Sequence, residues 1–354
     1  MEDGRFGNEV SLRNIIMNKE ITLSVIIPTY NRVSFLEATI NCFISQIKQD
    51  ALENEVEIII GDDTSPDSTR EYLEKLEASY PFIKTFTNSK NLGLSGNVEK
   101  LVHTASAPFI WLFGDDDLPT PSSLKRILQS IKSDNPNVIL LNTANIMSHD
   151  DRNLDYTILG ENRLSISRDV YVESFQVEKT KLAAVKNWLY LTNLVSAVAF
   201  KKDLFLQELP EAKKYLRPEN VYVFQAPLII GIARHGRLKI IAERSVLHRK
   251  NETHWSKTLH GNFVVSLYDG GEVIQVIKRY MPGEYHGYQK IFAVHTFAAV
   301  RRAKITGDNV NRYIIDALKR YYDCYPYNLR FLMALLIPGI IFRIYQKLWP
   351  NKTI

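Results

Sequence analysis

The sequence predicts an α/β protein built on a mostly parallel sheet flanked by helices and followed by a helical C-terminal region. Between residues 23 and 142, short apolar runs rich in β-branched residues alternate with segments of helical periodicity. This alternation is typical of βαβ units, whose strands pair in parallel. In addition, polar clusters directly follow three of the apolar runs, at the strand ends where parallel sheets bind ligands.

Seven apolar runs are predicted to be strands. They are short and mostly continuous, as expected of strands covered on both faces. In chain order they are Leu23–Pro28, Glu55–Gly61, Phe82–Thr87, Pro108–Phe113, Asn137–Leu141, Leu191–Phe200 and Leu238–Ala242.

Helices are predicted between these runs. Ser65-Pro66 is a helix-start signal, and Ser68 with Glu71 offers a competing capping box, so the start of that helix stays open. Residues 150–168 are polar and are expected to form a loop. The other predicted helices contain the periodic segments Val33–Ile47, Leu94–Ala105, Leu124–Ile131 and Val221–Ile232.

Composition and charge exclude several classes of protein. With 354 residues, 45% of them hydrophobic, the chain can bury a sizeable core and is long enough for two domains. A net charge of +5 is too small for a nucleic-acid-binding protein but suits phosphate ligands or an anionic membrane surface. Two cysteines do not make a disulfide framework, and residues 1–20 lack an apolar leader, so we expect a cytoplasmic protein.

An acidic triplet, Asp115–Asp117, follows the apolar run Pro108–Phe113. Three adjacent carboxylates repel one another unless something compensates their charge. Mg²⁺ or Mn²⁺ would do so, because these ions prefer oxygen ligands and usually combine one or two carboxylates with substrate phosphates. The alternative is a solvated acidic turn before the next helix.

Two further strand ends carry polar groups. Thr29–Arg32 offers Tyr30 for stacking on a base and Arg32 for a phosphate, and Asp63 offers a carboxylate to a base or ribose. Ordinary turn chemistry explains either cluster equally well when it is considered alone.

The runs VIIPTYNR, EIIIGDDTSPDST and NLGLSGN, followed by a strand that ends in DDD, together resemble family 2 of the GT-A glycosyltransferases. FGDDD is similar to the FGSDD of bacterial O-antigen sugar transferases such as abequosyltransferases. The resemblance implies a GT-A fold and a metal-dependent transfer of sugar from a nucleotide-diphosphate-sugar donor. UDP or CDP donors are favoured because Tyr30 and Asp63 suit uracil or cytosine. The expected acceptor is a glycan or lipid-linked saccharide in bacterial surface polysaccharide synthesis.

The resemblance also implies roles for individual residues. Asp115 would lie near the ribose, and Asp116, helped by Asp117, would bind the metal. A cationic segment begins at Arg244 and would neutralise the diphosphate as it leaves. The candidates for the nucleotide site are Pro28, Thr29, Tyr30, Arg32, Asp63, Asn97, Asp115, His248 and Arg249.

Two departures from the family pattern leave alternatives open. Gly114 stands where many members have the first aspartate of Asp-x-Asp-Asp, so the metal falls to the later aspartates. The usual Glu-Asp pair is absent: Glu219 is the candidate catalytic base, and Gln225 stands at the usual acidic position. The transfer is therefore inverting through Glu219, or retaining, or uses a base elsewhere. A catalytically inactive sugar-nucleotide or glycan-binding module at the membrane is the alternative function.

The chain is divided into an N-terminal extension (1–20), a GT-A catalytic domain (21–258) and a helical C-terminal domain (259–354). Within the last, Asn328–Trp349 combines apolar residues with Arg330, Arg343 and Lys347. Such a segment is typical of a helix lying on an anionic membrane, here the inner face of the cytoplasmic membrane. Ordinary packing within a helical domain is the alternative.

Overall fold

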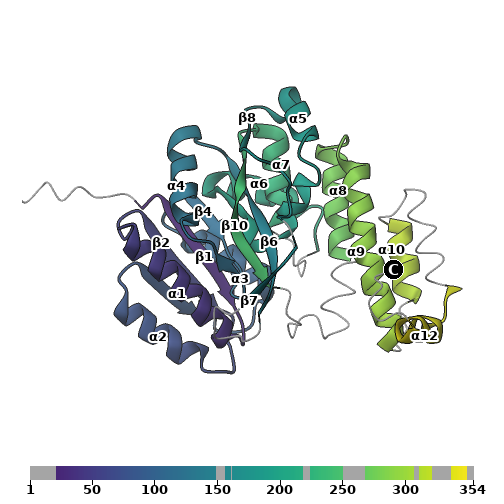
Figure 1. Ribbon diagram of the computed structural model, residues 1–354, viewed down its shortest axis with the longest axis horizontal. Coiled ribbons are helices and arrows are strands. Elements are labelled where there is room, and N and C mark those ends of the chain that lie inside the picture. The colour runs from purple at the N-terminus through teal and green to yellow at the C-terminus, as the bar shows by residue number, and fades with distance from the viewer. Residues whose placement is uncertain are drawn as a thin grey trace, which may run out of the picture.

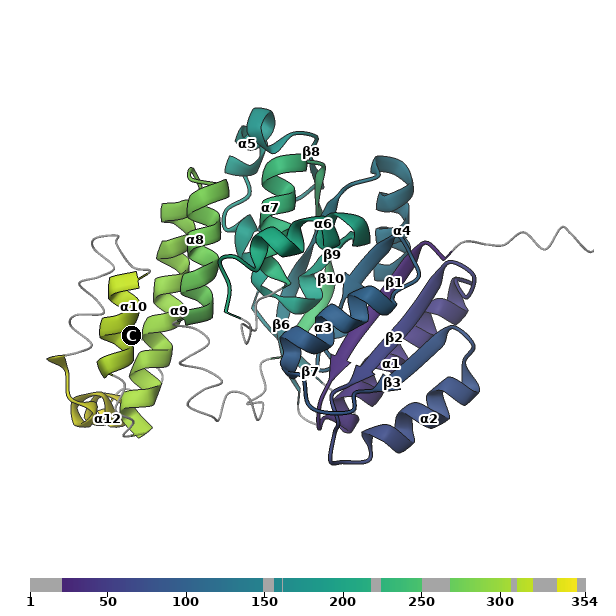
Figure 2. The same ribbon diagram turned by 180° about the vertical axis from the view of Figure 1, so that it is seen from behind.

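The computed structural model describes residues 21–148, 156–160, 162–217, 224–249, 268–306, 311–320 and 336–348. A twisted sheet is covered by helices on both faces, and the C-terminal helices stand beside it (Figures 1 and 2). The predicted α/β architecture and C-terminal helices are confirmed.

Ten described strands form one sheet, in the order β3-β2-β1-β4-β9-β6-β10-β5, with β7 on β6 and β8 on β10. Strands β1–β4 pair in parallel, as do β6 and β10, whereas β9 is antiparallel to both β4 and β6. The strands are β1 (Leu23–Thr29), β2 (Val56–Asp62), β3 (Ile83–Thr87), β4 (Phe109–Leu112), β5 (Leu118–Pro119), β6 (Val138–Ser148), β7 (Tyr156–Leu159), β8 (Val170–Val172), β9 (Val198–Lys201) and β10 (Leu238–Arg249).

Helices bury both faces of this sheet. Alternate side chains of β1 serve the two cores: Val25 and Ile27 pack toward α1, and Ile26 packs toward α3. On the first face lie α1 (Val33–Gln49), α2 (Thr69–Ser79) and α4 (Ser123–Asp134); on the second lie α3 (Gly93–Thr104), α5 (Phe175–Ala183), α6 (Lys202–Ala212) and α7 (Gln225–His235).

The C-terminal helices extend the second core. α8 (Gly270–Tyr280) packs against α7, and α9 (Tyr285–Thr306) packs against α8. They are followed by α10 (Asn311–Arg320) and α12 (Gly339–Leu348). None of the helices in the described ranges is both long and apolar enough to cross a membrane. The predicted boundary at residue 258 lies outside the described residues.

The structure corrects the predicted strand Leu191–Phe200. Its first part forms two 3₁₀ helices, η1 (Trp188–Asn193) and η2 (Val195–Ala197), and only β9 is extended. A short buried apolar run does not distinguish strand from helix by periodicity, which explains the error. Here the Thr192 hydroxyl donates to the carbonyl of Leu189, one turn earlier.

Two smaller boundaries also differ, and the structure decides one that the sequence left open. The expected loop at 150–168 contains β7, and β10 continues through the cationic segment as far as Arg249. α2 begins at Thr69, with Ser68 at the N-cap position and Glu71 in the first turn, so the later of the two predicted starts is the observed one. The Ser68 side chain makes no capping hydrogen bond; instead the Asp67 carboxylate accepts hydrogen bonds from the backbone amide and hydroxyl of Thr69.

We expect Gly61→Ala to destabilise the protein by about 1–3 kcal/mol, because α3 approaches β2 too closely for a side chain. A Cβ at Gly61 would lie 2.7 Å from Asn97 Oδ1 and 2.8 Å from Phe86 Cζ. Gly283→Ala is the matched control, since its Cβ would have no neighbour within 4 Å. Chemical denaturation of both variants tests this, and equal midpoints would contradict the close approach.

Candidate active site

The polar clusters predicted at three strand ends meet at one edge of the sheet. The backbone amide of Asp63 donates to the carbonyl of Thr29 at 3.0 Å, joining the end of β2 to that of β1. The amide of Phe113 donates to the carbonyl of Ile26 at 3.0 Å, joining β4 to β1. The acidic triplet therefore begins beside Thr29.

Arg32 bridges the first two aspartates of the triplet. Its Nη1 lies 3.1 Å from Asp115 Oδ1 and 3.2 Å from Asp116 Oδ2. The other oxygen of Asp115 accepts a hydrogen bond from the Thr29 hydroxyl at 2.8 Å. One guanidinium thus offsets part of the repulsion that the sequence predicts.

Asp117 has a different set of partners. Its Oδ2 accepts from the Ser196 hydroxyl at 2.6 Å, and its Oδ1 lies 2.9 Å from His248 Nδ1 and accepts from the Arg249 amide at 3.1 Å. Because an ionised carboxylate only accepts hydrogen bonds, Nδ1 of His248 carries the proton. Nε2 is then left to meet a ligand, as in carboxylate–histidine–metal arrangements.

The backbone of the triplet is held from two sides. The Thr39 hydroxyl on α1 lies 2.7 Å from the carbonyl oxygen of Asp117 and 3.0 Å from that of Asp115. Ser196 accepts from the Gly114 amide at 2.8 Å while donating to Asp117. A Cβ at Gly114 would approach Asp116 Oδ1 and Ser196 Oγ to 3.3 Å, so glycine leaves room beside both groups.

The three carboxylates differ in pKa because their surroundings differ. Burial and repulsion from Asp117 and Asp115 raise the pKa of Asp116 to about 7. Burial also raises the pKa of Asp115, although Arg32 and Thr29 oppose this. Burial acts in the same direction on Asp117, but the charge and hydrogen bond of His248 outweigh it and hold the pKa of Asp117 below its usual value. Asp117 in turn raises the pKa of His248.

Asp116 is the carboxylate that fits a divalent cation. Its Oδ1 has no hydrogen-bond partner among the described residues, and 19% of its side chain is exposed. Both oxygens of Asp117 are engaged by protein donors. Within the described ranges no three His, Cys, Asp or Glu side chains form a ready metal site. The residues therefore fit a cation that takes most of its ligands from phosphates and water.

A second cluster lies at the end of β2. Asp63 Oδ1 accepts from Asn88 Nδ2 at 2.9 Å and from the Leu92 amide at 2.8 Å. Asn97 donates to the carbonyl of Gly61 at 2.7 Å and accepts from Asn88 at 3.2 Å. The Asp63 carboxylate is thereby fixed in orientation.

The side chains of the remaining sequence candidates make none of these contacts. Pro28 is a buried residue of β1, and Tyr30 is 47% exposed just beyond that strand. The Arg249 guanidinium lies over the ring of Phe35, 5.3 Å from its centroid, so its amide rather than its side chain contacts the triplet. Glu219 lies outside the described residues.

Sequence reasoning missed two groups of site residues. Thr39 and Ser196 each carry a hydroxyl within an otherwise apolar segment, and this was the only feature of the sequence that could have indicated a role for them. The second group surrounds Gln225, whose Nε2 lies 2.8 Å from both Thr192 Oγ1 and the Tyr288 hydroxyl and close to Asn193 Oδ1. Tyr288 belongs to α9, and no local pattern indicates that this helix contacts Gln225.

The known proteins that this chain resembles in sequence include several glycosyltransferases. A processive diacylglycerol beta-glycosyltransferase of Mycoplasma pneumoniae is 27% identical over 66% of this chain and 67% of its own. The abequosyltransferase RfbV of Salmonella typhimurium is 37% identical over 30% of this chain and 32% of its own. A crystal structure of S. aureus TarS 1-349 in complex with UDP-GlcNAc has a TM-score of 0.54 and 15% identity, covering 89% of this chain and 80% of that one, which shows a shared fold.

The sequence also matches a family model, that of glycosyl transferase family 2, over residues 24–201. The match runs from β1 through β9, and so includes Thr29, the acidic triplet and Ser196. It covers half of the chain, and the motifs and fold agree with it. The chain belongs to glycosyl transferase family 2.

Proposed function

We propose that this glycosyltransferase is metal-dependent and transfers a sugar from a UDP or CDP donor to a glycan or lipid-linked saccharide. The observation that carries the proposal is the division of labour within the triplet. Asp116 has an unoccupied oxygen among the described contacts, whereas Asp117 is saturated by Ser196, His248 and Arg249. In a solvated acidic turn without a ligand, we would not expect protein donors to bond both oxygens of one carboxylate and leave an oxygen of its neighbour without a partner.

The chain's own residues would bind and orient the donor diphosphate. Asp116 would hold Mg²⁺ or Mn²⁺, which supplies positive charge to the leaving diphosphate. Asp117 keeps Nε2 of His248 free for a phosphate oxygen or the same cation, so Asp117 acts through His248. Arg32 holds Asp115 and Asp116 side by side, and Asp115 would lie near the ribose.

The Asp63 cluster would read the nucleotide base. Asn88 and Leu92 both donate to Oδ1, so Oδ2 is the oxygen available to a ligand. A carboxylate needs a donor, which uracil offers at N3–H and cytosine at its amino group. Exposed Tyr30 beside it would stack on the ring.

The acceptor is proposed from the relatives and from the position of the base. The Mycoplasma relative's name specifies a lipid acceptor, and RfbV, matched over about a third of its length, is named for a sugar transfer. Glu219 stays our candidate base for an inverting transfer, because the Gln225 amide has no basic group to take the acceptor proton. The three-part division at residues 20 and 258 likewise stays a proposal.

The C-terminal helix α12 would hold the enzyme against an anionic membrane. It exposes four aliphatic side chains in and just before the helix, and Lys347 is exposed near its end. A surface helix of a water-exposed protein rarely leaves so much apolar area open. The four residues are Leu336 (78% exposed), Ile340 (56%), Ile341 (52%) and Ile344 (53%).

We expect Ile340→Glu/Ile344→Glu to reduce sedimentation with phosphatidylglycerol-containing vesicles by at least about tenfold. Two exposed aliphatic side chains that would insert into the membrane are replaced by carboxylates, which the anionic lipids repel. Turnover of a water-soluble acceptor should not change. Lys132→Glu, on the distant α4, lowers the net charge by as much as the double variant does and is the charge-matched control. Undiminished sedimentation of the double variant would remove α12 from the membrane contact.

Metal-dependent donor binding should weaken as the pH falls below about 7. A cation needs the ionised form of Asp116, and the pKa of that carboxyl is raised to about 7 by burial and by its acidic neighbours. Manganese-dependent UDP affinity should therefore drop by up to about tenfold per pH unit between pH 6.5 and 5. Asp116→Asn should abolish the dependence, and a flat profile in the wild type would contradict the assignment.

A thermal-shift panel tests the function as a whole. UDP, CDP, GDP and dTDP are each added with and without Mn²⁺, because a ligand that binds only the folded state raises its apparent stability. We expect the largest manganese-dependent shift with UDP or CDP. A shift without turnover of any donor sugar would favour the inactive binding module, and no shift with any nucleotide would overturn the proposal.

A further inference from the structure

Arg163 lies on a segment that is fixed to the sheet beside the site. Its backbone amide donates to the carbonyl of Thr143 on β6 at 2.7 Å. The side chain of Asn142 then holds the next residue twice, because Leu164 both donates to and accepts from it at 2.9 Å. The backbone that carries Arg163 is thus anchored on both sides of the residue.

The Arg163 side chain is positioned as firmly as its backbone. Nη2 donates to Asn145 Oδ1 at 3.1 Å, and the guanidinium lies over the ring of Tyr190, 5.1 Å from its centroid. Asn145 on β6 is the register partner of His248 on β10. Partners on paired parallel strands point to the same face and lie roughly 4.8 Å apart. Arg163 therefore stands about one strand away from the imidazole that bonds Asp117.

This cation has no carboxylate partner of its own. Among the described residues, no carboxylate lies within 4.0 Å of the Arg163 guanidinium, although many other arginines here are paired. Its Nε is buried and has no hydrogen-bond partner in the described part of the chain. Leaving a partly buried charge uncompensated is costly, and a planar guanidinium suits phosphate oxygens through its Nη donors.

We propose that Arg163 binds a phosphate oxygen of the donor diphosphate beside His248. The inference rests on the proposed function and adds a residue to it. Held by Asn145 and Tyr190, the guanidinium needs no rearrangement to meet charge that develops on the leaving group. A neighbouring carboxylate would have neutralised the guanidinium, whereas the neutral partners Asn145 and Tyr190 leave its positive charge for the phosphate.

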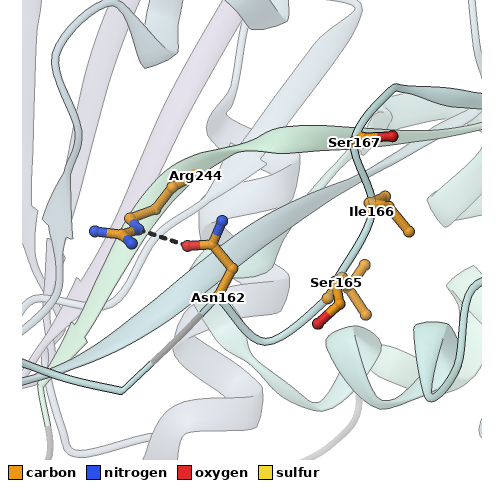
Figure 3. Close-up of a pocket in the computed structure, with 6 residues that line it drawn as sticks. Asn162, Ser165, Ile166, Ser167 and Arg244 are labelled. Carbon is orange, nitrogen blue, oxygen red and sulfur yellow. Dashed lines mark hydrogen bonds between the residues drawn. The ribbon is translucent and has the colours of Figure 1, made fainter.

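The same segment offers a matched control on its other contact. Arg244 donates from Nε to Asn162 Oδ1 at 2.8 Å, and both residues line a cavity with Ser165, Ile166 and Ser167 (Figure 3). Asn162→Ala removes this contact of the segment and changes no charge. It leaves Arg163 with Asn145 and Tyr190, so it separates loss of the segment's support from loss of the phosphate contact.

The experiment compares the binding of uridine, UMP and UDP, each with Mn²⁺, to the wild type, Arg163→Gln, Arg163→Lys and Asn162→Ala. We expect Arg163→Gln to weaken UDP by about 10- to 100-fold and uridine by less than about twofold, as loss of a charge-assisted hydrogen bond predicts. Arg163→Lys should recover part of the loss, and Asn162→Ala should bind UDP as the wild type does.

The other outcomes separate the two proposals. UDP affinity that is unchanged in Arg163→Gln overturns the inference; a raised KM for a phosphorylated acceptor in that variant would then assign the guanidinium to the acceptor's phosphate. An equal loss of uridine and UDP would show a structural role and also overturn it. Failure of the wild type to bind any of the three ligands would overturn the proposed uridine donor instead, and the inference with it.

Discussion

Asp116→Ala is expected to lower kcat/KM for the donor by about 10³-fold, or about 4 kcal/mol of transition-state stabilisation. The reason is that Asp116 offers the available carboxylate oxygen of the triplet. The unfolding free energy should stay the same or rise slightly. Removing a carboxylate whose pKa is already raised to about 7 by its neighbours relieves repulsion, and Arg32 keeps Asp115 as a partner.

Steady-state turnover with and without Mn²⁺, together with urea denaturation, measures both halves of this prediction. Asp134→Ala is a control, since that carboxylate lies at the end of α4 and pairs with Lys239. A variant that keeps at least a tenth of the wild-type kcat/KM with its metal dependence intact would be incompatible with Asp116 as the metal ligand.

Asp117→Ala should instead destabilise the fold, by about 3–5 kcal/mol. Three donors would lose their acceptor inside the protein: the Ser196 hydroxyl, Nδ1 of His248 and the Arg249 amide. A raised His248 pKa in the wild type reflects this carboxylate, so its loss lowers that pKa and removes the ion pair. Activity should fall as well, because His248 loses the group that orients it.

Asp117→Asn distinguishes packing from charge, because the amide keeps the shape but accepts at only one atom. We expect it to lose less stability than Asp117→Ala and still lose about 10- to 100-fold in activity. The two triplet positions thus behave oppositely under the same alanine substitution. If Asp117→Ala unfolded at the same urea concentration as Asp116→Ala, the division of labour would be wrong.

Much of the fold was predictable because its first half follows local rules. The β1–β4 strands are short apolar runs between periodic helices, and parallel strands bring their carboxyl ends to one edge. That rule alone places Thr29, Asp63 and Asp115 near one another. The antiparallel β9 and the 3₁₀ turns before it depend on burial within the whole core, which periodicity does not report.

The roles within the site were less predictable than its location. Sequence adjacency makes Asp116 and Asp117 look equivalent, yet Ser196 and His248, 79 and 131 residues away from Asp117, saturate one of them. Arg163 lies in a polar segment that resembles any loop, and its place beside His248 comes from the β6–β10 register. Such long-range partners set chemical roles, and no local pattern in the sequence encodes them.

Calorimetric titration of UDP into the wild type and Asp116→Asn, each with and without Mn²⁺, tests the central claim most directly. The account predicts that Mn²⁺ tightens UDP binding to the wild type by at least about tenfold and has no effect on Asp116→Asn, while metal-free affinities stay alike. A manganese effect of equal size in Asp116→Asn would contradict the account, because the cation would then be bound by other groups.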